Sequence, residues 1–383
     1  MLLALGPAIQ ALKGLGAPEA ERVFGRAGEL SRRAGETGPA FQALWGQWMV
    51  SAGLGRVGDA RPIGGELLSL AEQSHDRALL LQAHHAMWAT SFWLGELSAA
   101  EHHIRQGISF YDPEQHRPLA FLYGGHDPGV CCRQFSIWAH WLSGRPIQAG
   151  TASQAAIGLA EQLAHPPSLA QALTWTCVLL FFERNGPAAG YLARRLVDLA
   201  TERELPAWRA AGMIIDGWSR SEGGDGGAGI EQIREGLVAA RKTGTLMPLE
   251  PLYLMFLVDS CVRHGRAEEG LRATDDALAL MTAGRVQIWR SEFHRLKGEL
   301  GLSGPSADPR TAERLFRQAL EIARQQRIPA WELRAATSLG RLLGGSDRRD
   351  EARQTLGAVL GRFTEGLDTA NLTEARAVLS ELS

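Results

Sequence analysis

The stretch Phe92-Trp93-Leu94-Gly95-Glu96-Leu97-Ser98-Ala99-Ala100-Glu101 decides the fold of this chain. An apolar run ends at Leu94, and Gly95 supplies the positive φ that the end of a helix favours. Ser98 can then cap a second helix whose first turn carries Glu101. The stretch therefore predicts a helical hairpin, in which two helices meet at a glycine turn.

The same pattern recurs with a period near 40 residues. Glycines that follow an apolar run and precede a charged amphipathic run stand at positions 55, 95, 144, 186, 265 and 344. The first five are separated by 40, 49, 42 and 79 residues, the last interval being two units. Pro206-Ala207-Trp208 also recurs as Pro329-Ala330-Trp331, 123 residues or three units later, and these prolines are expected to begin helices. Such a period is typical of tetratricopeptide-like helical pairs.

The two helices of each unit differ in composition, as expected for a solenoid. First helices such as 79–94 and 170–182 are apolar nearly all round, whereas second helices such as 268–281 and 311–326 carry charges along one stripe. The first helices are therefore expected to form an inner spine and the second helices an outer surface. No segment alternates with period two over the length of a strand, so no sheet is expected.

Together these patterns predict an all-α, right-handed superhelical solenoid of about nine tetratricopeptide-like helix-turn-helix repeats. We expect one domain over residues 1–383, with an irregular insertion at 111–128 and a C-terminal cap at 368–383. Asn371 is expected to be the N-cap of the helix in that cap. The expected pairs span 1–35, 39–75, 77–110, 129–164, 167–204, 206–243, 248–284, 286–326 and 328–361.

The composition gives no reason to expect a nucleic-acid or membrane partner. Hydrophobic residues make up 45% of the 383 residues and charged residues 21%, with a net charge of −2. The four cysteines lack CxxC spacing and suit a reducing compartment. The N-terminus has no basic signal-peptide region, and the most apolar segment, 172–182, is too short to cross a bilayer. We therefore expect a cytoplasmic protein.

Several segments carry a family resemblance, namely 93–97, 106–108, 111–113, 123–130, 334–339 and 363–369. They resemble the C-terminal tetratricopeptide-like region of large bacterial signalling proteins, which join an adenylate or guanylate cyclase domain, or a DNA-binding domain, to a signal-transduction NTPase. The resemblance covers essentially the whole chain and implies a regulatory or scaffold module in bacterial signal transduction. The sequence has no Walker A motif and no cyclase metal-binding motif, so neither activity is expected of this chain.

Two motifs that could carry chemistry fit structural roles better. Gly224, Gly226 and Gly229 satisfy GxGxxG, but a dinucleotide site needs a strand before the turn, and a helix is expected there. Histidines at 84, 85, 102 and 103 lie on the two helices of one unit, yet adjacent residues on a helix point about 100° apart. At most one of each pair then faces the other helix, which is fewer ligands than zinc requires. We therefore expect no metal site, no cofactor and no catalytic residue.

The insertion is the best candidate for a binding site because it interrupts the regular spacing of the helical hairpins. Long loops in compact arrays are often functional, and its polar and aromatic side chains suit contact with a ligand or peptide. The alternative is a structural staple, in which His126 and Asp127 cap the helix that begins near Gly129. The candidate binding residues are Tyr111, His116, Arg117, Tyr123, His126 and Asp127.

The sequence thus predicts a non-catalytic interaction module that binds a partner protein or peptide through its concave surface and the insertion. One alternative is a sensor of a small-molecule effector, and another is an enzyme built on the solenoid. A closed pocket lined by inner tryptophans would favour the sensor, an open groove the protein partner, and convergent ionisable groups in a deep pocket the enzyme. Most of the eleven tryptophans are expected to pack between repeats.

Overall fold

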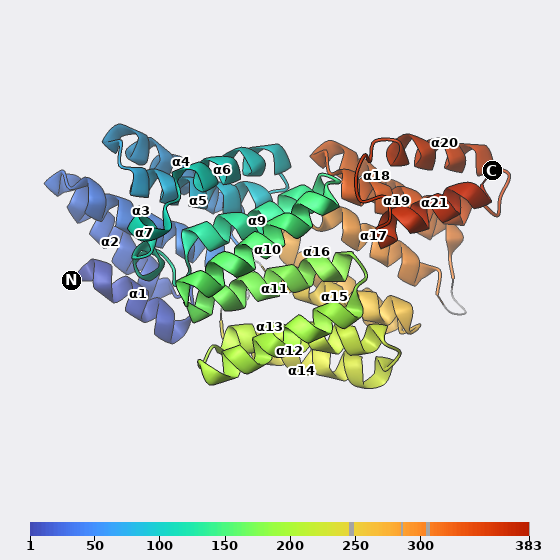
Figure 1. The fold of residues 1–383 in the computed structure, drawn as a ribbon, viewed down its shortest axis with the longest axis horizontal. Helices are drawn as coiled ribbons and strands as arrows, with labels where there is room; N and C mark the ends of the chain where they lie inside the picture. Colours follow the sequence, from blue (N-terminus) through green and yellow to red (C-terminus); the bar gives the residue numbers. More distant parts are fainter. Residues whose placement is uncertain (245–248, 285, 304–306, 383) are drawn as a thin grey trace.

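The computed structural model is all-helical over the residues that it describes, which are 1–244, 249–284, 286–303 and 307–382, with Ala11 described by its backbone alone. Figure 1 labels the helices along the chain. Their bounds are α1 (Leu2–Lys13), α2 (Pro18–Ala34), α3 (Thr37–Gly53), α4 (Val57–Ser74), α5 (Arg77–Trp93), α6 (Leu97–Phe110), α7 (Pro113–His116), α8 (Leu119–Leu122), α9 (Pro128–Leu142), α10 (Pro146–Leu163), α11 (Pro166–Phe182), α12 (Gly186–Glu202), α13 (Pro206–Glu222), α14 (Gly226–Lys242), α15 (Glu250–Arg263), α16 (Ala267–Gly284), α17 (Arg290–Gly301), α18 (Pro309–Gln326), α19 (Pro329–Leu343), α20 (Arg349–Leu360) and α21 (Ala370–Glu381).

The long helices pack in consecutive pairs, which confirms the predicted solenoid of tetratricopeptide-like hairpins. Each pair begins and ends within a few residues of its predicted range. The short helices α7 and α8 fall between the third and fourth pairs, and α21 follows the ninth. Residue 248, the predicted start of the seventh pair, and residue 383, the predicted end of the cap, lie outside the described residues. In the part of the chain that the structure describes, no helix is both long and apolar enough to cross a membrane.

Burial separates inner from outer helices, as the compositions predict. In α11, every residue from Ala170 to Leu179 is buried, because neighbouring helices cover it on all sides. In α18, burial is confined to one stripe at spacings of three and four residues, from Ala312 to Ala323. The first helix of a pair therefore faces the superhelix axis and the second faces outward.

Prolines and glycines lie at most of the helix ends where the sequence predicts them. Proline occupies the first helical turn of α13 and α19, as the repeated tripeptide predicted. Gly95 turns the chain after α5 with a φ of 78°, and a Cβ there would lie only 2.6 Å from the Gln326 amide nitrogen.

Some predicted helix boundaries are wrong. Ser98 lies within α6, whose N-cap is Glu96, so it does not cap that helix. Gly186 begins α12, and Arg184 takes the left-handed conformation instead, with a φ of 58°. Its guanidinium donates two hydrogen bonds to the Asp259 carboxylate, at 2.7 and 2.8 Å, and these bonds offset the cost of that backbone conformation.

The superhelix completes one turn about every five pairs, and successive turns touch. The turn after α1, in the first pair, reaches the end of the sixth pair, where a Cβ on Gly14 would lie 2.8 Å from the Gly244 carbonyl oxygen. The third pair reaches the eighth, because the Gln287 N–H donates to the Trp93 carbonyl at 2.7 Å.

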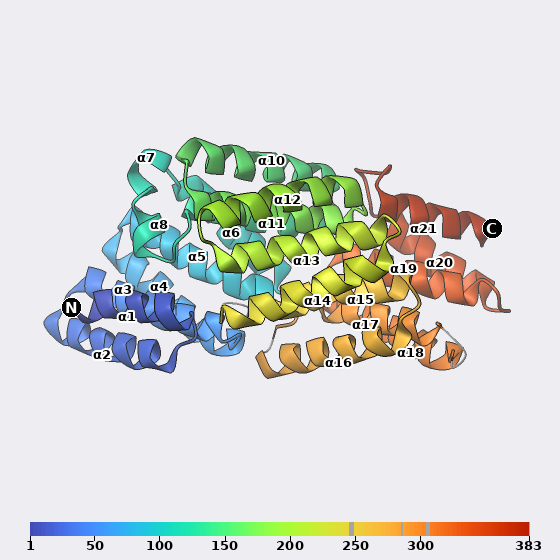
Figure 2. The same cartoon turned by 90° about the horizontal axis from the view of Figure 1, so that it is seen from below.

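The same offset continues to the end of the chain. The Trp141 ring of the fourth pair lies 5.3 Å from the Trp331 ring of the ninth, measured between centroids. The Asn371 amide in α21 donates to the Phe182 carbonyl of the fifth pair at 2.7 Å. The termini nevertheless lie at opposite ends of the long axis, with α1–α3 at one end and α20 and α21 at the other in both Figure 1 and Figure 2.

Aromatic side chains fill the axis where the turns meet. Trp138 of α9 lies at the centre of this cluster, with ring centroids 5.2 Å from Trp289, 5.5 Å from Trp175 and 5.6 Å from Phe182. Edge-to-face contacts of this kind stabilise beyond the area that they bury. The axis is therefore packed with side chains in its C-terminal part.

The C-terminal helix α21 packs against α19 and α20. Its N-cap is Thr369, so the prediction of Asn371 in that role is wrong. Asn371 instead accepts a hydrogen bond from Arg334 at 2.6 Å and donates to Phe182, which ties the cap to two other units.

Candidate functional site

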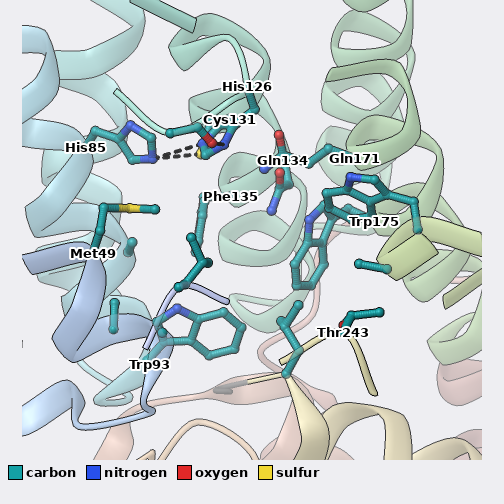
Figure 3. Close-up of a pocket in the computed structure, with 18 of the residues that line it drawn as sticks. Met49, His85, Trp93, His126, Cys131, Gln134, Phe135, Gln171, Trp175 and Thr243 are labelled. Carbon is teal, nitrogen blue, oxygen red and sulfur yellow. Dashed lines mark hydrogen bonds between the residues drawn. The ribbon is translucent and has the colours of Figure 1, made fainter. Parts of the chain in front are cut away.

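The N-terminal part of the axis is hollow. A cavity of about 320 Å³ lies between the inner helices α3, α5, α9, α11, α13 and α15, and Leu15, Gly124 and Thr243 close its rim. Figure 3 shows side chains of α3, α5, α9 and α11 converging on it. Its volume is at the lower end of the range of small-molecule pockets. The second to seventh pairs enclose this space, which the side chains of the described residues leave unfilled.

The walls of this axial cavity are mainly aromatic and apolar. Trp48, Trp93, Phe135 and Trp175 contribute indole and phenyl faces, and Tyr253 closes the far side. These residues come from five different pairs, so the cavity belongs to the superhelix and not to one hairpin. Flat aromatic surfaces of this kind suit an apolar or aromatic ligand.

Three buried polar atoms on this wall have no hydrogen-bond partner among the residues that the structure describes. They are the side-chain oxygens of Gln134 and Gln171 and the indole nitrogen of Trp175. The two glutamines are 2% and 6% exposed and point toward the cavity in Figure 3. Buried polar groups are nearly always paired, so these atoms mark places where a ligand or water would bond.

A group of histidine and cysteine side chains forms one end of the cavity. The Nε2 atoms of His85 and His126 are 3.4 Å apart, and the Cys131 Sγ is 3.1 Å from His85 Nε2. His85 Nδ1 faces the Gln82 side-chain oxygen at 3.1 Å, and His126 Nδ1 faces the Gly124 carbonyl at 3.0 Å. Figure 3 shows the three side chains pointing toward one another.

Burial controls the protonation of this group. It lowers the pKa of His126 to about 4 and holds the pKa of His85 well below its usual value, with a smaller repulsion between the two imidazoles. Burial also raises the pKa of the Cys131 thiol, and the neighbouring Cys132 adds to the effect. All three side chains are therefore uncharged near neutral pH.

Of the residues predicted from the insertion, His126 lines the axial cavity and the other five do not. Tyr111 donates to the Asp127 carboxylate at 3.1 Å, and Asp127 accepts from the Val130 N–H, which makes it the N-cap of α9. Burial raises the pKa of Asp127, although its hydrogen bonds act in the opposite direction. The expectation that Asp127 caps this helix is confirmed, whereas His126 makes no cap bond.

The remaining predicted residues are spread over the loop. His116 is buried and accepts from the Asp112 N–H at 2.9 Å, and Tyr123 packs edge-on against the Trp45 ring. Arg117 donates to the Leu163 carbonyl at 3.1 Å and lines a separate cavity of about 100 Å³ together with Asp127. The insertion therefore makes many contacts with its own fold, and it leaves Phe121 and Leu122 of α8 exposed.

The other motifs lie where structural roles are expected. Of the GxGxxG glycines, Gly224 lies in the turn between α13 and α14, and Gly226 and Gly229 lie in the first turn of α14, so a helix and not a strand precedes the motif. His84 and His103 face each other across the third pair, with their Nδ1 atoms 2.9 Å apart. The sequence argument that one histidine of each pair faces the other helix holds for these two residues.

A buried ion network joins α17 to α19. Glu292 is 2% exposed and accepts from Arg295 at 2.6 and 3.0 Å and from Arg334 at 2.9 and 3.2 Å. Burial alone would raise the pKa of Glu292, but the two guanidinium groups lower it to about 2. The Arg184–Asp259 pair lies beside this network and adds to its field. These charges are paired with one another and lie apart from the axial cavity.

Sequence reasoning did not identify His85, Cys131, Gln134, Gln171 or Trp175 as site residues. A usable signal was present for the two glutamines, because each is an uncharged amide within a mainly apolar inner helix. Such an amide has no place in a core unless it is paired.

No protein-family model matches the sequence, and comparison with curated proteins finds no match. Among solved structures, the chain is similar to a Rap protein in complex with the Competence and Sporulation Factor, with a TM-score of 0.59 and 10% identity over 100% of this chain and 98% of that one. It is also similar to a signal-transduction ATPase with a tetratricopeptide repeat sensor from Pyrococcus horikoshii, with a TM-score of 0.41 and 14% identity over 96% of this chain and 56% of that one. Yeast Tom70 gives a TM-score of 0.43 and 12% identity over 99% and 95% of the two chains. The first likeness shows that this chain has the fold of a tetratricopeptide-type superhelical protein.

Proposed function

We propose that this protein is a non-catalytic recognition module that senses a small, mainly apolar effector in its axial cavity. The observation that carries the proposal is the conjunction of aromatic walls with the unpartnered polar atoms of Gln134, Gln171 and Trp175. The walls supply affinity by removing apolar ligand surface from water, and the polar atoms fix the ligand's orientation. The effector therefore has an aromatic or aliphatic body and at least one group that both donates and accepts hydrogen bonds.

The signal would leave the site through the contacts between superhelical turns. Residues of the second to seventh pairs line the cavity, and each of these pairs also touches its neighbours. A ligand that bridges these pairs changes their relative rotation and so the curvature of the outer surface. A regulatory partner, such as the NTPase of a bacterial signalling protein, would respond to that surface.

A direct test uses 1-naphthylacetamide as the probe and 1-propylnaphthalene, which lacks the amide, as its matched control. Tryptophan fluorescence of the full chain should report saturable one-to-one binding of the amide and at least about tenfold weaker binding of the hydrocarbon. Gln134→Leu keeps the side-chain volume and removes the polar atoms, so it should abolish this preference without lowering the melting temperature. Gln325→Leu, at an exposed glutamine of α18, is the control substitution. Equal binding of the two probes, or no binding of either, would contradict the proposal.

A second candidate function is recognition of a protein or peptide at the insertion 111–128. It is favoured by the exposed Phe121 and Leu122, of which Phe121 is 78% exposed. The similar Rap protein was solved with a bound factor, which fits a recognition role for such a superhelix. Phe121→Ser with Leu122→Ser should leave the melting temperature unchanged and remove binding to the product of an adjacent signalling gene. Retained binding would exclude this surface.

A further inference from the structure

We propose that His85, His126 and Cys131 bind a thiophilic d10 cation, Zn²⁺ or Cu⁺, with one coordination position open to the axial cavity. This inference concerns a metal and does not depend on which effector the cavity takes. Among the described residues, His85 and His126 each offer a ring nitrogen and Cys131 offers its sulfur. These three atoms lie within 4.8 Å of one another. Imidazole and thiolate are the ligands that these two ions prefer.

The hydrogen bonds fix which ring nitrogens are free to bind. Each Nδ1 faces an oxygen acceptor, the Gln82 side chain for His85 and the Gly124 carbonyl for His126, so each Nδ1 carries the proton. Both Nε2 atoms then present lone pairs, and they face each other at 3.4 Å. Two lone pairs in this arrangement repel unless a cation lies between them. The Cys131 S–H can satisfy His85, but among the described residues the only partner of His126 Nε2 is the lone pair of His85 Nε2.

The distances match a tetrahedral site closely. Metal–nitrogen bonds of about 2.0–2.1 Å place two tetrahedral nitrogens about 3.3 Å apart, and a metal–sulfur bond of about 2.3 Å places nitrogen and sulfur about 3.5 Å apart. The observed nitrogen pair is 3.4 Å apart, and the His85 nitrogen is 3.1 Å from sulfur. His126 Nε2 and Cys131 Sγ lie within 4.8 Å of each other, so this side needs at most about 1.3 Å of closure. His126 can supply that movement because Gly124 and Gly125 precede it, with φ values of 118° and 74°.

The surroundings resemble those of known metal-binding histidines. Outer acceptors on Nδ1 orient the rings and raise the basicity of Nε2. His85 is further held by stacking on Trp88, with centroids 4.6 Å apart and planes inclined by 15°. All three candidate ligands line the axial cavity, so the fourth position faces it and can take water or a donor atom of a bound effector. Binding would release the Cys131 proton to solvent and leave a metal–thiolate bond.

The test measures metal binding to the full chain with Zn²⁺ alone, Cu⁺ alone under reducing conditions, and Co²⁺ as a spectroscopic substitute for zinc. We expect one ion per chain, a raised melting temperature, and a thiolate-to-cobalt charge-transfer absorption. Cys131→Ser should remove that absorption, and His126→Ala should weaken binding at least about 100-fold. His126 is half-buried in a loop, so its substitution should leave the fold intact. Cys177→Ser, at a buried thiol in α11, is the matched control and should behave as wild type.

Separate titrations with Zn²⁺ and Cu⁺ show which ion binds. Binding of either ion that is weakened by Cys131→Ser and by His126→Ala supports the proposal. Failure of Zn²⁺ and Cu⁺ to bind at one ion per chain would overturn it. Binding that survives in both Cys131→Ser and His126→Ala would also overturn it, since the ion would then lie elsewhere. Naphthylacetamide binding is measured separately without metal, so failure of one proposal leaves the other standing.

Discussion

Replacing Glu292 by glutamine should destabilise the protein by about 3 kcal/mol, because it removes the carboxylate that the two buried guanidinium groups of Arg295 and Arg334 share. The pKa of Glu292 is about 2 in the folded protein against 4.5 for the free side chain. A difference of about 2.5 pH units at about 1.4 kcal/mol each gives about 3 kcal/mol at neutral pH. This agrees with the cost of about 3–5 kcal/mol for breaking a buried ion pair.

The pH dependence gives the prediction a second readout. Because folding lowers the pKa of this carboxyl group, its stabilisation is complete above about pH 4.5 and is lost as the pH falls toward 2. The stability difference between wild type and Glu292→Gln should therefore be largest at pH 7 and fall by about half at pH 3.

Urea unfolding followed by tryptophan fluorescence measures this difference at each pH. Glu268→Gln is the matched control, because Glu268 is 93% exposed and lies 3.8 Å from Arg272. The control should change stability by less than about 0.5 kcal/mol. A loss below about 1 kcal/mol for Glu292→Gln at pH 7, or a difference that stays constant down to pH 3, would refute the reasoning.

Further predictions concern helix packing, capping and protonation. Gly107→Ala should destabilise the protein by about 1–3 kcal/mol, because the new Cβ would overlap the Trp88 ring. Gly65→Ala, in open space on α4, should instead stabilise it by about 0.5–1 kcal/mol. Urea unfolding of both variants measures this contrast, and equal effects would contradict it. Asp76→Ala should lower stability by about 1 kcal/mol because the carboxylate accepts from two N–H groups of α5, and an unchanged melting temperature would count against this capping role. Burial, aided by neighbouring histidines, lowers the pKa of His84 to about 4, so the unfolded chain binds its proton at higher pH and stability should fall as the pH drops from 6.5 toward 4. His84→Asn should lessen that fall, and identical pH profiles of the two proteins would rule the explanation out.

The helical pairs could be predicted because their signals are local. An apolar run, a glycine with positive φ and a proline in the next first turn lie within a few residues of each other, and Gly95 and Pro206 behave as the pattern indicates. Gly186 did not, because the left-handed conformation at Arg184 depends on Asp259, 75 residues further along the chain. A contact of that range leaves no trace in a local pattern.

The axial cavity could not be predicted because no single unit contains it. Its walls come from pairs spread over most of the chain, and its existence depends on the superhelical pitch. From the sequence, His84 and His85 could be related only to the partner helix of the same hairpin. The residues that approach His85 come instead from the insertion, as His126, and from the next pair, as Cys131. The expectation of no metal site therefore left out the geometry on which our proposal rests.

The contact between pairs that are five positions apart also fixes how the protein can evolve. In an ordinary solenoid each repeat meets only its neighbours, so a unit can be gained or lost with little effect elsewhere. Here the carbonyl of Trp93 must meet Gln287, and that of Phe182 must meet Asn371. Duplicating or deleting one unit between them would bring every later pair to the wrong counterpart, so the number of repeats is locked while their surface residues remain free to diverge.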